Sequence, residues 1–388
     1  MKIKGINNEN IFQRRLIIMI KRVYIDNFHC FTNFEIKLEN NPSALFMGKN
    51  GVGKSSLFSA LLILQKIANG DNNLAQSIKK QDFGLLGINH PVTFEFDIEK
   101  NKKNFSYKLI IEYPDKFYQP RIKEENLTVD GKACFTRNQA SISVGKAKFS
   151  LDWHIAALPI IQAAPNDNVT IFRDWLKNML LIAPNPRLMT GITNQEAGIS
   201  LKVSGSNFVS WLSHILGQYP HLYSYIDKYT KDFFSDFSCF IFQDVGKDSR
   251  ELELQFEKDN KTFTIAFDCL SDGEKLIFMS GAIFAFAQKE SNSFCFWDEP
   301  NNYISASIMD NFIRKLLSGF EKKSSQFWVI SHNIEVIAGF NDDNSWVFRR
   351  NDHTSATLPP KNIAELRKSK AFDGDLTMGI LTGDIYEA

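Results

Sequence analysis

The stretch GKNGVGKS, Gly48 to Ser55, limits the possible folds more than any other part of the chain. It fits the phosphate-binding pattern G-x-x-x-x-G-K-[ST], which requires a strand before it and a helix after it. Apolar residues from Ser43 to Gly48 predict that strand, and leucines at helical spacing between Ser55 and Gly70 predict the helix. Glycines let successive backbone N–H groups converge on phosphate oxygens at a helix N-terminus. We therefore expect a phosphate site in which Lys54 reaches the β- and γ-phosphates and Ser55 binds Mg²⁺.

Composition limits the class of protein. The chain has 388 residues, 44% of them hydrophobic, so it can bury a large core and is long for one compact domain. Its net charge is +1, so the chain has no excess of basic residues of the kind expected where phosphate contacts dominate affinity for nucleic acid. The five cysteines include no Cys-x-x-Cys pair, which argues against a disulfide framework or a zinc site. The longest apolar run, Leu276 to Ala287, is shorter than the ~20 residues that span a bilayer. We expect a soluble cytoplasmic protein with no membrane partner.

The periodicity of apolar residues divides the chain into segments. Residues 1–18 are interpreted as an N-terminal extension. Residues 19–153 hold the phosphate-binding pattern and then alternate apolar with polar residues, which predicts an antiparallel meander. Residues 154–245 carry helical spacing and are interpreted as a helical insertion, with helices at Phe172 to Leu181, Asn207 to Leu216 and Leu222 to Phe234. Residues 246–388 return to alternating strands and helices, so the expected fold class is α/β.

Two carboxylates follow a second apolar strand in FCFWDEP, Phe294 to Pro300. Open α/β sheets bind their ligands at the carboxyl ends of the strands, where these side chains stand. We expect Asp298 to hold Mg²⁺ and Glu299 to polarise the water that attacks the γ-phosphate. Taken alone, the pair fits a cap of the next helix equally well. The preceding phosphate-binding pattern favours the catalytic interpretation.

A histidine follows a third apolar strand in FWVISHN, Phe327 to Asn333. On its own, a histidine at this place is more often a structural hydrogen-bonding residue than a catalytic one. Its position after both preceding motifs favours a catalytic role for His332 instead.

With the stretch LSDGEK at Leu270, these motifs resemble the ABC-type ATPase head of the RecF/SMC/Rad50 group. The resemblance covers most of the chain outside the insertion, and the opening YIDNFHCFTNFEIKL is similar to that group's first strands. Within the group, DEPNNYIS and SHN are most similar to stand-alone ATPases of bacterial anti-phage systems, such as the OLD-like, PARIS and Septu ATPases. The resemblance implies a P-loop ATPase head with an antiparallel β subdomain, with the insertion in place of a coiled coil.

The resemblance also implies which residues bind ATP and Mg²⁺, and that the enzyme is a slow ATPase. In such heads LSDGEK closes over the nucleotide of a second copy, so the chain is expected to form a homodimer or larger even-numbered oligomer with composite sites. The metal ligands implied are Ser55 and Asp298, and the catalytic residues are Glu299 and His332. The nucleotide-binding residues implied are Gly48, Asn50, Gly51, Gly53, Lys54, Ser55, Ser56 and, in trans, Ser271, Gly273 and Glu274.

Some positions depart from the group's pattern or leave a choice open. LSDGEK corresponds to the group's signature motif, which usually reads Leu-Ser-Gly-Gly. Asp272 replaces the first glycine of that motif, which places a charge near phosphate. The Q-loop role falls to Gln65 or Gln81, and spacing does not choose between them. Asn302 either touches the P-loop, GKNGVGKS (the Walker A motif), of the opposite copy or only shapes the turn after FCFWDEP, the Walker B motif. For adenine stacking, the aromatic candidates are Phe28 and Phe31.

Two functions follow as alternatives. In the first, the chain is an ATP-gated sensor and scaffold in anti-phage defence that controls a separately encoded toxic effector and responds to a phage protein. The absence of a recognisable nuclease motif and the low net charge favour this reading. In the second, it is a RecF-like repair ATPase that clamps DNA, for which Lys100 to Lys103 and Lys361 to Lys370 are the candidate basic runs.

Overall fold

A computed structural model describes most of the chain, in residues 18–38, 41–71, 74–100, 102–115, 117–193, 200–289, 293–323 and 325–387. The predicted N-terminal extension lies outside these ranges except for Ile18, the first residue of strand β1 (Ile18–Asp26). Among the described helices, none is both long and apolar enough to cross a membrane.

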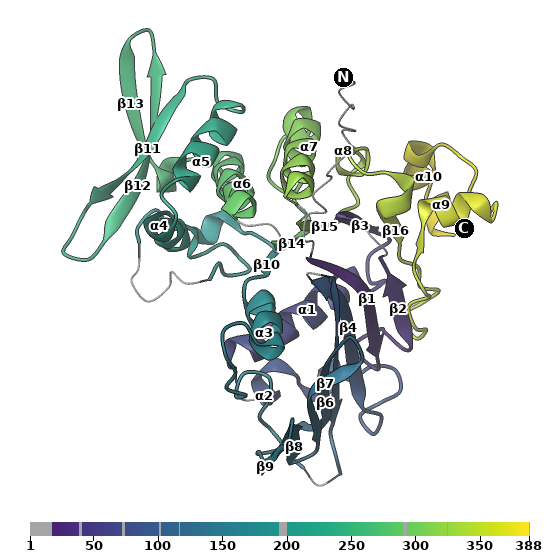
Figure 1. Ribbon diagram of the computed structural model, residues 1–388. Helices are drawn as coiled ribbons and strands as arrows, with labels where there is room; N and C mark the ends of the chain where they lie inside the picture. The colour runs from purple at the N-terminus through teal and green to yellow at the C-terminus, as the bar shows by residue number, and fades with distance from the viewer. Residues whose placement is uncertain are drawn as a thin grey trace, which may run out of the picture.

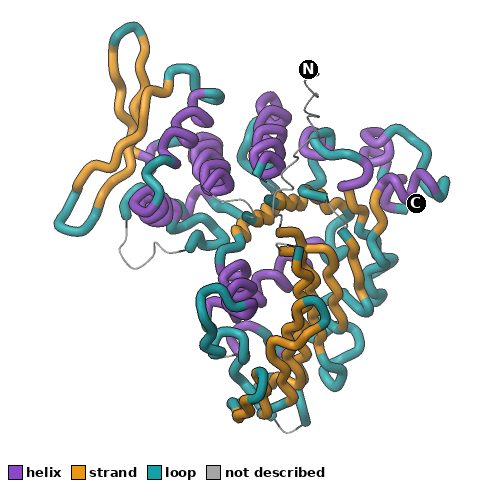
Figure 2. The backbone as a smooth tube through the Cα atoms, viewed as in Figure 1, coloured by secondary structure: helices purple, strands orange, loops and turns teal. Residues whose placement is uncertain are grey.

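The centre of the molecule is a six-stranded sheet in the order β10-β14-β15-β3-β16-β17 (Figures 1 and 2). Its first five strands run parallel, and the short β17 pairs antiparallel with β16. Parallel strands covered on both faces read as continuous apolar runs, which explains why every residue of β3 is buried. The strands are β3 (Ser43–Met47), β10 (Leu180–Ile182), β14 (Phe294–Asp298), β15 (Gln326–Ile330), β16 (Ser345–Val347) and β17 (Lys361–Asn362).

Alternate residues of this sheet enter two different cores. Phe46, Phe296 and Trp328 pack with helix α1 (Lys54–Asn69) and the antiparallel lobe. Leu45 and Trp297 face the other way, toward α6 (Asp272–Lys289) and α7 (Ala306–Lys322). Figure 1 shows α6 and α7 above the sheet and α1 below it. The phosphate-binding strand therefore lies in the middle of a layered α/β unit, as its motif requires.

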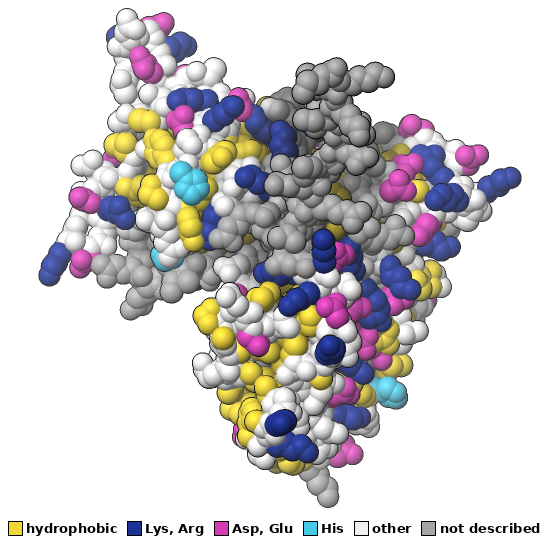
Figure 3. All heavy atoms as spheres, in the orientation of Figure 1, with side chains coloured by type: hydrophobic (Ala, Val, Ile, Leu, Met, Phe, Trp, Pro, Cys, Tyr) yellow, Lys and Arg dark blue, Asp and Glu magenta, His cyan; other side chains and the backbone are white. Residues whose placement is uncertain are grey.

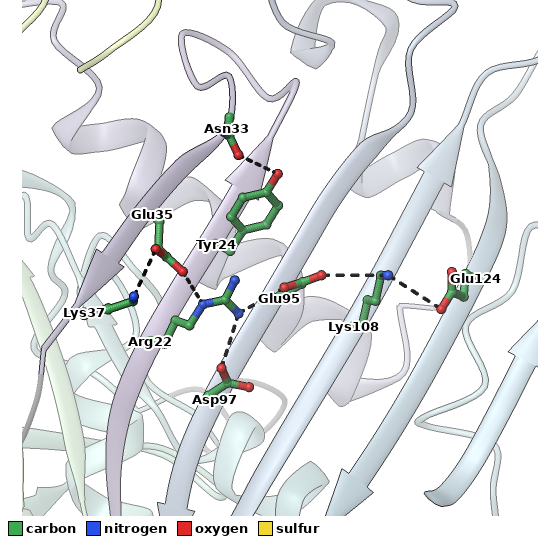
Figure 4. Close-up of polar contacts among 9 residues, drawn as sticks. All are labelled: Arg22, Tyr24, Asn33, Glu35, Lys37, Glu95, Asp97, Lys108 and Glu124. Atoms are coloured by element: carbon green, nitrogen blue, oxygen red, sulfur yellow. Dashed lines mark hydrogen bonds and ion pairs between the residues drawn. The ribbon is translucent and has the colours of Figure 1, made fainter. Parts of the chain in front are cut away.

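An eight-stranded antiparallel sheet, β2-β1-β4-β5-β6-β7-β8-β9, forms the lower lobe in Figure 1 and confirms the predicted meander. On its polar face, Arg22 lies between Glu35 of β2 and two acidic residues of β4, Glu95 and Asp97 (Figure 4). Burial acts to lower the pKa of Arg22, but the hydrogen bonds that Arg22 donates to Glu35 and Glu95 outweigh it and raise that pKa. The strands beyond β1 are β2 (Phe34–Lys37), β4 (Val92–Lys100), β5 (Lys103–Glu112), β6 (Arg121–Val129), β7 (Lys132–Asn138), β8 (Ser141–Val144) and β9 (Ala147–Ser150).

The segment 154–245 is only partly helical, which corrects the predicted insertion. It contains α3 (Asn168–Lys177), α4 (Phe208–Gln218) and α5 (Leu222–Lys231), close to the three expected helices. It also contains β10 of the central sheet and β11 (Phe237–Asp244), which pairs with β12 (Arg250–Lys258) across the expected boundary at 245. Short apolar runs cannot be assigned to strand or helix by periodicity, which is why the predicted helix Phe172 to Leu181 extends into β10.

Strands β11, β12 and β13 (Lys261–Ala266) form a third sheet. This sheet projects from the upper left of Figure 1, beside α5.

Gln326 joins the two large sheets. Its fully buried side chain accepts a hydrogen bond from Ile20 N at 2.8 Å and donates one to Ile20 O at 3.2 Å. A side-chain amide can satisfy a backbone N–H and C=O together, much as a neighbouring strand would. The contact ties β1 to β15 and so fixes the antiparallel lobe against the central sheet. The remaining helices are α2 (Leu74–Ser77), α8 (Ile334–Ile337), α9 (Ile363–Lys368) and α10 (Leu376–Thr382).

Candidate nucleotide-binding site

A cavity of about 610 Å³ opens at the carboxyl ends of β3, β14 and β15. We define the P-loop as residues 48–55, and five of its residues, Asn50, Gly51, Gly53, Lys54 and Ser55, line the cavity. Ser56 and both Walker B carboxylates line it as well, whereas His332 does not. Gly48 does not line the cavity; its carbonyl oxygen supports Lys54 from outside. The lining residues are His29, Cys30, Asn50, Gly51, Gly53, Lys54, Ser55, Ser56, Gln81, Phe83, Asp298, Glu299, Ile330 and Arg350.

The backbone at Gly53 explains one of the P-loop glycines. Gly53 is the N-cap of α1 and has a φ of 106°, in the left-handed region. A Cβ atom there would lie 2.6 Å from the Phe31 ring and 2.8 Å from Cys30 Sγ. Both the dihedral and the close approach exclude a side chain, so the loop can turn into the helix only with glycine at this position.

Lys54 is held at the floor of the cavity and is only 8% exposed. Its Nζ donates hydrogen bonds to Gly48 O at 2.6 Å and to Lys49 O at 3.0 Å. Burial lowers the pKa of this amine, and the nearby charges of Glu299 and Asp298 act in the opposite direction. The ammonium group thus lies inside the loop, beside the two carboxylates.

Asp298 and Glu299 occupy different environments at the end of β14. Burial raises the pKa of Asp298 to about 6, with a further contribution from the charge of Glu299, while Lys54 opposes the shift. Glu299 has a left-handed φ of 50°, which is uncommon for a residue with a side chain and typical of functional sites. Its backbone N–H donates to Ile330 O at 2.9 Å, which anchors it to the end of β15.

His332 meets Glu299 at this edge of the sheet. The Nδ1 atom of His332 lies 2.9 Å from Glu299 Oε1, while the His332 side chain is 64% exposed. The second carboxylate oxygen, Glu299 Oε2, is buried and has no hydrogen-bond partner within the described residues. The carboxylate is therefore oriented through one oxygen and has acceptor capacity left on the other.

The donor set around Ser55 and Asp298 fits Mg²⁺. This ion prefers oxygen ligands and commonly takes one or two carboxylates, with phosphates and waters completing its shell. The hydroxyl of Ser55, the Asp298 carboxylate and the unpartnered Glu299 oxygen are donors of this kind, and all three residues line the cavity. No group of three or more His, Cys, Asp and Glu side chains placed to hold a metal occurs in the described ranges. A metal ion here would therefore depend on the phosphates for its remaining ligands.

The residues LSDGEK lie at the start of α6, and none of them lines the cavity. Ser271 and Glu274 form a capping box, in which Ser271 N donates to Glu274 Oε2 at 2.8 Å and Glu274 N donates to Ser271 Oγ at 3.3 Å. A Cβ atom at Gly273 would lie 2.9 Å from Tyr303 O, so the segment after Walker B packs directly on this glycine. Asp272, which replaces a glycine of the usual motif, forms an ion pair with Arg187 at 3.6 Å. The guanidinium of Arg187 offsets the negative charge of Asp272.

The structure distinguishes the places of several residues whose roles sequence spacing does not decide. Gln81 lines the cavity, whereas Gln65 Nε2 donates to Met179 O at 2.5 Å and holds α1 to the segment before β10. Asn302 N donates to Glu299 O at 3.3 Å, within the turn. Phe28 and Phe31 are both 0% exposed, so the stacking prediction is wrong for them. Their apolar rings fill the core beneath the site instead of facing it.

Two polar lining residues were missed by sequence reasoning. His29 Nδ1 lies 3.2 Å from Ser56 Oγ, and His29 Nε2 lies 3.2 Å from Asp82 Oδ1. Arg350 reaches the cavity from the loop after β16. His29 stands between two expected strands and Arg350 follows an apolar run, but neither pattern distinguishes a site residue from an ordinary loop residue.

Comparison with known proteins places this arrangement in a family. The model of the RecF/RecN/SMC N-terminal domain matches residues 19–356. An Smc head crystallised with the C-terminal winged-helix domain of ScpA has 14% sequence identity and a TM-score of 0.53, over 90% of this chain and 99% of the other. An Smc head with an extended coiled coil from Pyrococcus furiosus, bound to the C-terminal domain of ScpA, has 11% identity and a TM-score of 0.52, over 91% and 99%. No curated protein sequence matches the chain. The chain belongs to the RecF/RecN/SMC family and has the fold of its ABC-type ATPase heads.

Proposed function

We propose that this chain binds and hydrolyses ATP in composite sites between two copies, and that this cycle gates a scaffold in anti-phage defence. The single observation that carries the proposal is the division of the motifs. Both Walker motifs line one cavity, while Ser271 and Gly273 lie outside it at the start of α6. A signature that does not reach its own chain's cavity requires a second copy to act on a nucleotide.

The geometry supports a definite role for each residue. Lys54 would exchange the carbonyls of Gly48 and Lys49 for phosphate oxygens. The exchange is favourable because an ammonium group makes a stronger hydrogen bond to a charged oxygen than to a neutral carbonyl. Glu299 Oε2 would accept a proton from the attacking water, whose oxygen forms a bond to the γ-phosphorus as the bond to the ADP oxygen breaks. His332 orients that carboxylate through Oε1. Ser55 and Asp298 would hold Mg²⁺, which would neutralise charge on the phosphates.

In the partner copy, Ser271 and the N–H groups at the start of α6 would complete the site. A helix N-terminus favours an anion through its free N–H groups and its dipole, and Gly273 permits close approach. In the unengaged chain, Arg187 neutralises Asp272, and we propose that it does the same when phosphate arrives. Hydrolysis would remove the γ-phosphate contacts and let the two copies separate.

The proposed partners are a separately encoded effector, such as a nuclease, and a phage protein as trigger. The support is the resemblance to stand-alone defence ATPases and the Smc heads solved with a bound ScpA domain. We place effector recognition on the segment 172–242 and the sheet that projects beside it, where Tyr225 and Phe263 are exposed. Their replacement by serine should weaken effector binding and leave ATP hydrolysis intact, because neither residue lines the cavity.

The test of the proposed function is the mass in solution of the Glu299→Gln variant with and without ATP and Mg²⁺, measured by light scattering. We expect ATP to lock a dimer or a larger even-numbered oligomer, since loss of a general base slows turnover by about 10²- to 10⁴-fold. The control is the same variant with Lys54→Ala, which should stay unassociated. A monomer with ATP bound would show that the signature does not close a neighbouring site.

The DNA-clamp alternative finds no specific support in the described residues. Of its candidate basic runs, Lys103 donates to Asn168 at 3.2 Å, and Arg367 pairs with Asp342 at 2.8 Å. On the face drawn in Figure 3, basic and acidic side chains are interspersed over the lower lobe. Gel shifts at graded salt separate the two functions, because phosphate contacts give a steep dependence on salt concentration.

A further inference from the structure

A loop from the C-terminal part of the chain fastens the P-loop from outside. We name it the strap and define it as residues 348–357, directly after β16. At its start, Phe348 N donates to Met47 O at 2.8 Å, and at its end Thr357 Oγ1 donates to Val52 O at 2.8 Å. Between these points, Arg350 Nη1 donates to Gly51 O at 3.0 Å. The strap thus holds the backbone of the phosphate-binding segment at three places.

Arg350 does more than fasten, because it is also a lining residue of the cavity. A guanidinium group carries five N–H donors. Three of them are used on carbonyl oxygens: Nε on Ser355 at 2.7 Å, Nη1 on Gly51 at 3.0 Å and Nη2 on His353 at 2.6 Å. One N–H on each Nη atom remains. The three carbonyls fix the plane of the group, so its position is set before any ligand binds.

The charge of Arg350 matters because of what else lines the cavity. Asp298 and Glu299 are its acidic lining residues, and Lys54 and Arg350 are its lysine and arginine among the described residues. Lys54 lies within the loop, whereas Arg350 arrives from a different part of the chain, over Gly51. Arginine keeps its charge at any physiological pH and presents paired donors that match phosphate geometry.

We propose that Arg350 donates its two remaining N–H groups to phosphate oxygens of the bound nucleotide, as a second fixed cation of the site. This inference rests on the proposed function, because it assumes that the cavity binds ATP. It adds a residue from the strap, outside the Walker, signature and histidine motifs. It also gives the strap a role in recognition, because the carbonyls of Ser355 and His353 hold the guanidinium in place.

The experiment compares ATP and adenosine binding in the full-length protein, with calorimetry for ATP and ligand-observed NMR for adenosine. For Arg350→Ala we expect the Kd for ATP to rise about 10- to 100-fold, the range of a hydrogen bond to a charged group, with the Kd for adenosine unchanged. Arg350→Lys should recover part of the loss, because it keeps the charge without the paired donors. Thermal melting checks that each variant folds.

The matched control is Thr357→Val, which removes a fastening hydrogen bond and leaves the guanidinium in place. Because Val52 belongs to the P-loop, this variant measures how far a loosened strap alone weakens ATP binding, and we expect a smaller rise in the Kd for ATP than Arg350→Ala gives. The proposal is overturned if Arg350→Ala leaves ATP binding unchanged, weakens ATP and adenosine binding alike, or weakens ATP binding no more than Thr357→Val does. If the unaltered protein binds no ATP, the proposed function itself fails, so the two failures are distinguishable.

Discussion

Replacing Asp298 by asparagine should stabilise the nucleotide-free protein while abolishing ATP hydrolysis. The pKa of Asp298 is raised from 3.8 to about 6, first by burial and then by the charge of Glu299. A carboxyl whose folded pKa is raised contributes stability below its unfolded pKa and loses it as pH rises through the folded pKa. At neutral pH the ionised Asp298 therefore costs free energy of folding, and asparagine, which cannot ionise, removes that cost.

The size of the gain follows from the two pKa values. The difference between 3.8 and about 6, at 1.36 kcal/mol for each pKa unit, gives an upper limit of about 3 kcal/mol at neutral pH. Partial solvent access and the neighbouring Glu299 reduce this, so we expect ~1 to 2 kcal/mol at about pH 7.5. Near pH 4 the side chain is protonated in the folded state, and in the unfolded one, with a pKa of 3.8, it is about two-fifths protonated, so the gain should fall below about 1 kcal/mol.

The assay is urea denaturation followed by tryptophan fluorescence, for which the buried Trp297 next to Asp298 is a local probe. The control is Asp310→Asn, which replaces an exposed aspartate paired with Arg314 on α7 and should change stability little. An Asp298→Asn protein that is no more stable than the parent at about pH 7.5, or whose gain persists undiminished at about pH 4, would refute the electrostatic reasoning.

Other changes test separate contacts. Gln81→Ala should lower the ATPase rate at unchanged stability, whereas Gln65→Ala should mainly lower the melting temperature, because only Gln81 lines the cavity; the reverse pattern would contradict this placement. Gly273→Ala should reduce ATP turnover without weakening ATP binding to the isolated chain, since its Cβ would lie 2.9 Å from Tyr303 O; equal losses in both measurements would argue against a role in trans. Arg137→Ala should destabilise the lower lobe by about 3 to 5 kcal/mol in urea, because it leaves the fully buried Glu125 without its cation; recovery by the added Glu125→Gln change would confirm the cause.

The sequence predicts most of the local parts of the site, because each depends on neighbouring residues. The P-loop, the Walker B carboxylates and His332 come from short patterns at strand ends, and parallel strands bring such ends together. The roles of Gln65 and Gln81 could not be assigned in this way. Gln65 lies within α1 and Gln81 follows it. Only the path of the chain after α1 places Gln81 at the cavity.

Burial and long-range contacts account for the remaining differences. Phe28 and Phe31 look available beside a loop, but aromatic spacing does not reveal which face of a turn enters the core. Strand β10 has three residues, too few for a period, and is recognisable only by its pairing with β14. Arg350 cannot be recognised as a cavity residue from the sequence, because it reaches the site only through the pairing of β16 with β3.

The strand order of the central sheet has a consequence for synthesis on the ribosome. Strand β3, which leads into the P-loop, pairs with β15 (Gln326–Ile330) on one side and β16 (Ser345–Val347) on the other. The P-loop is therefore translated long before either of the strands that flank β3. Non-local pairing of this kind forms late and leaves apolar strands exposed until it is complete. A nascent chain would have its Walker A sequence early but could assemble the cavity only after β15 and β16 have emerged, so chains that stop before β16 would lack the completed site.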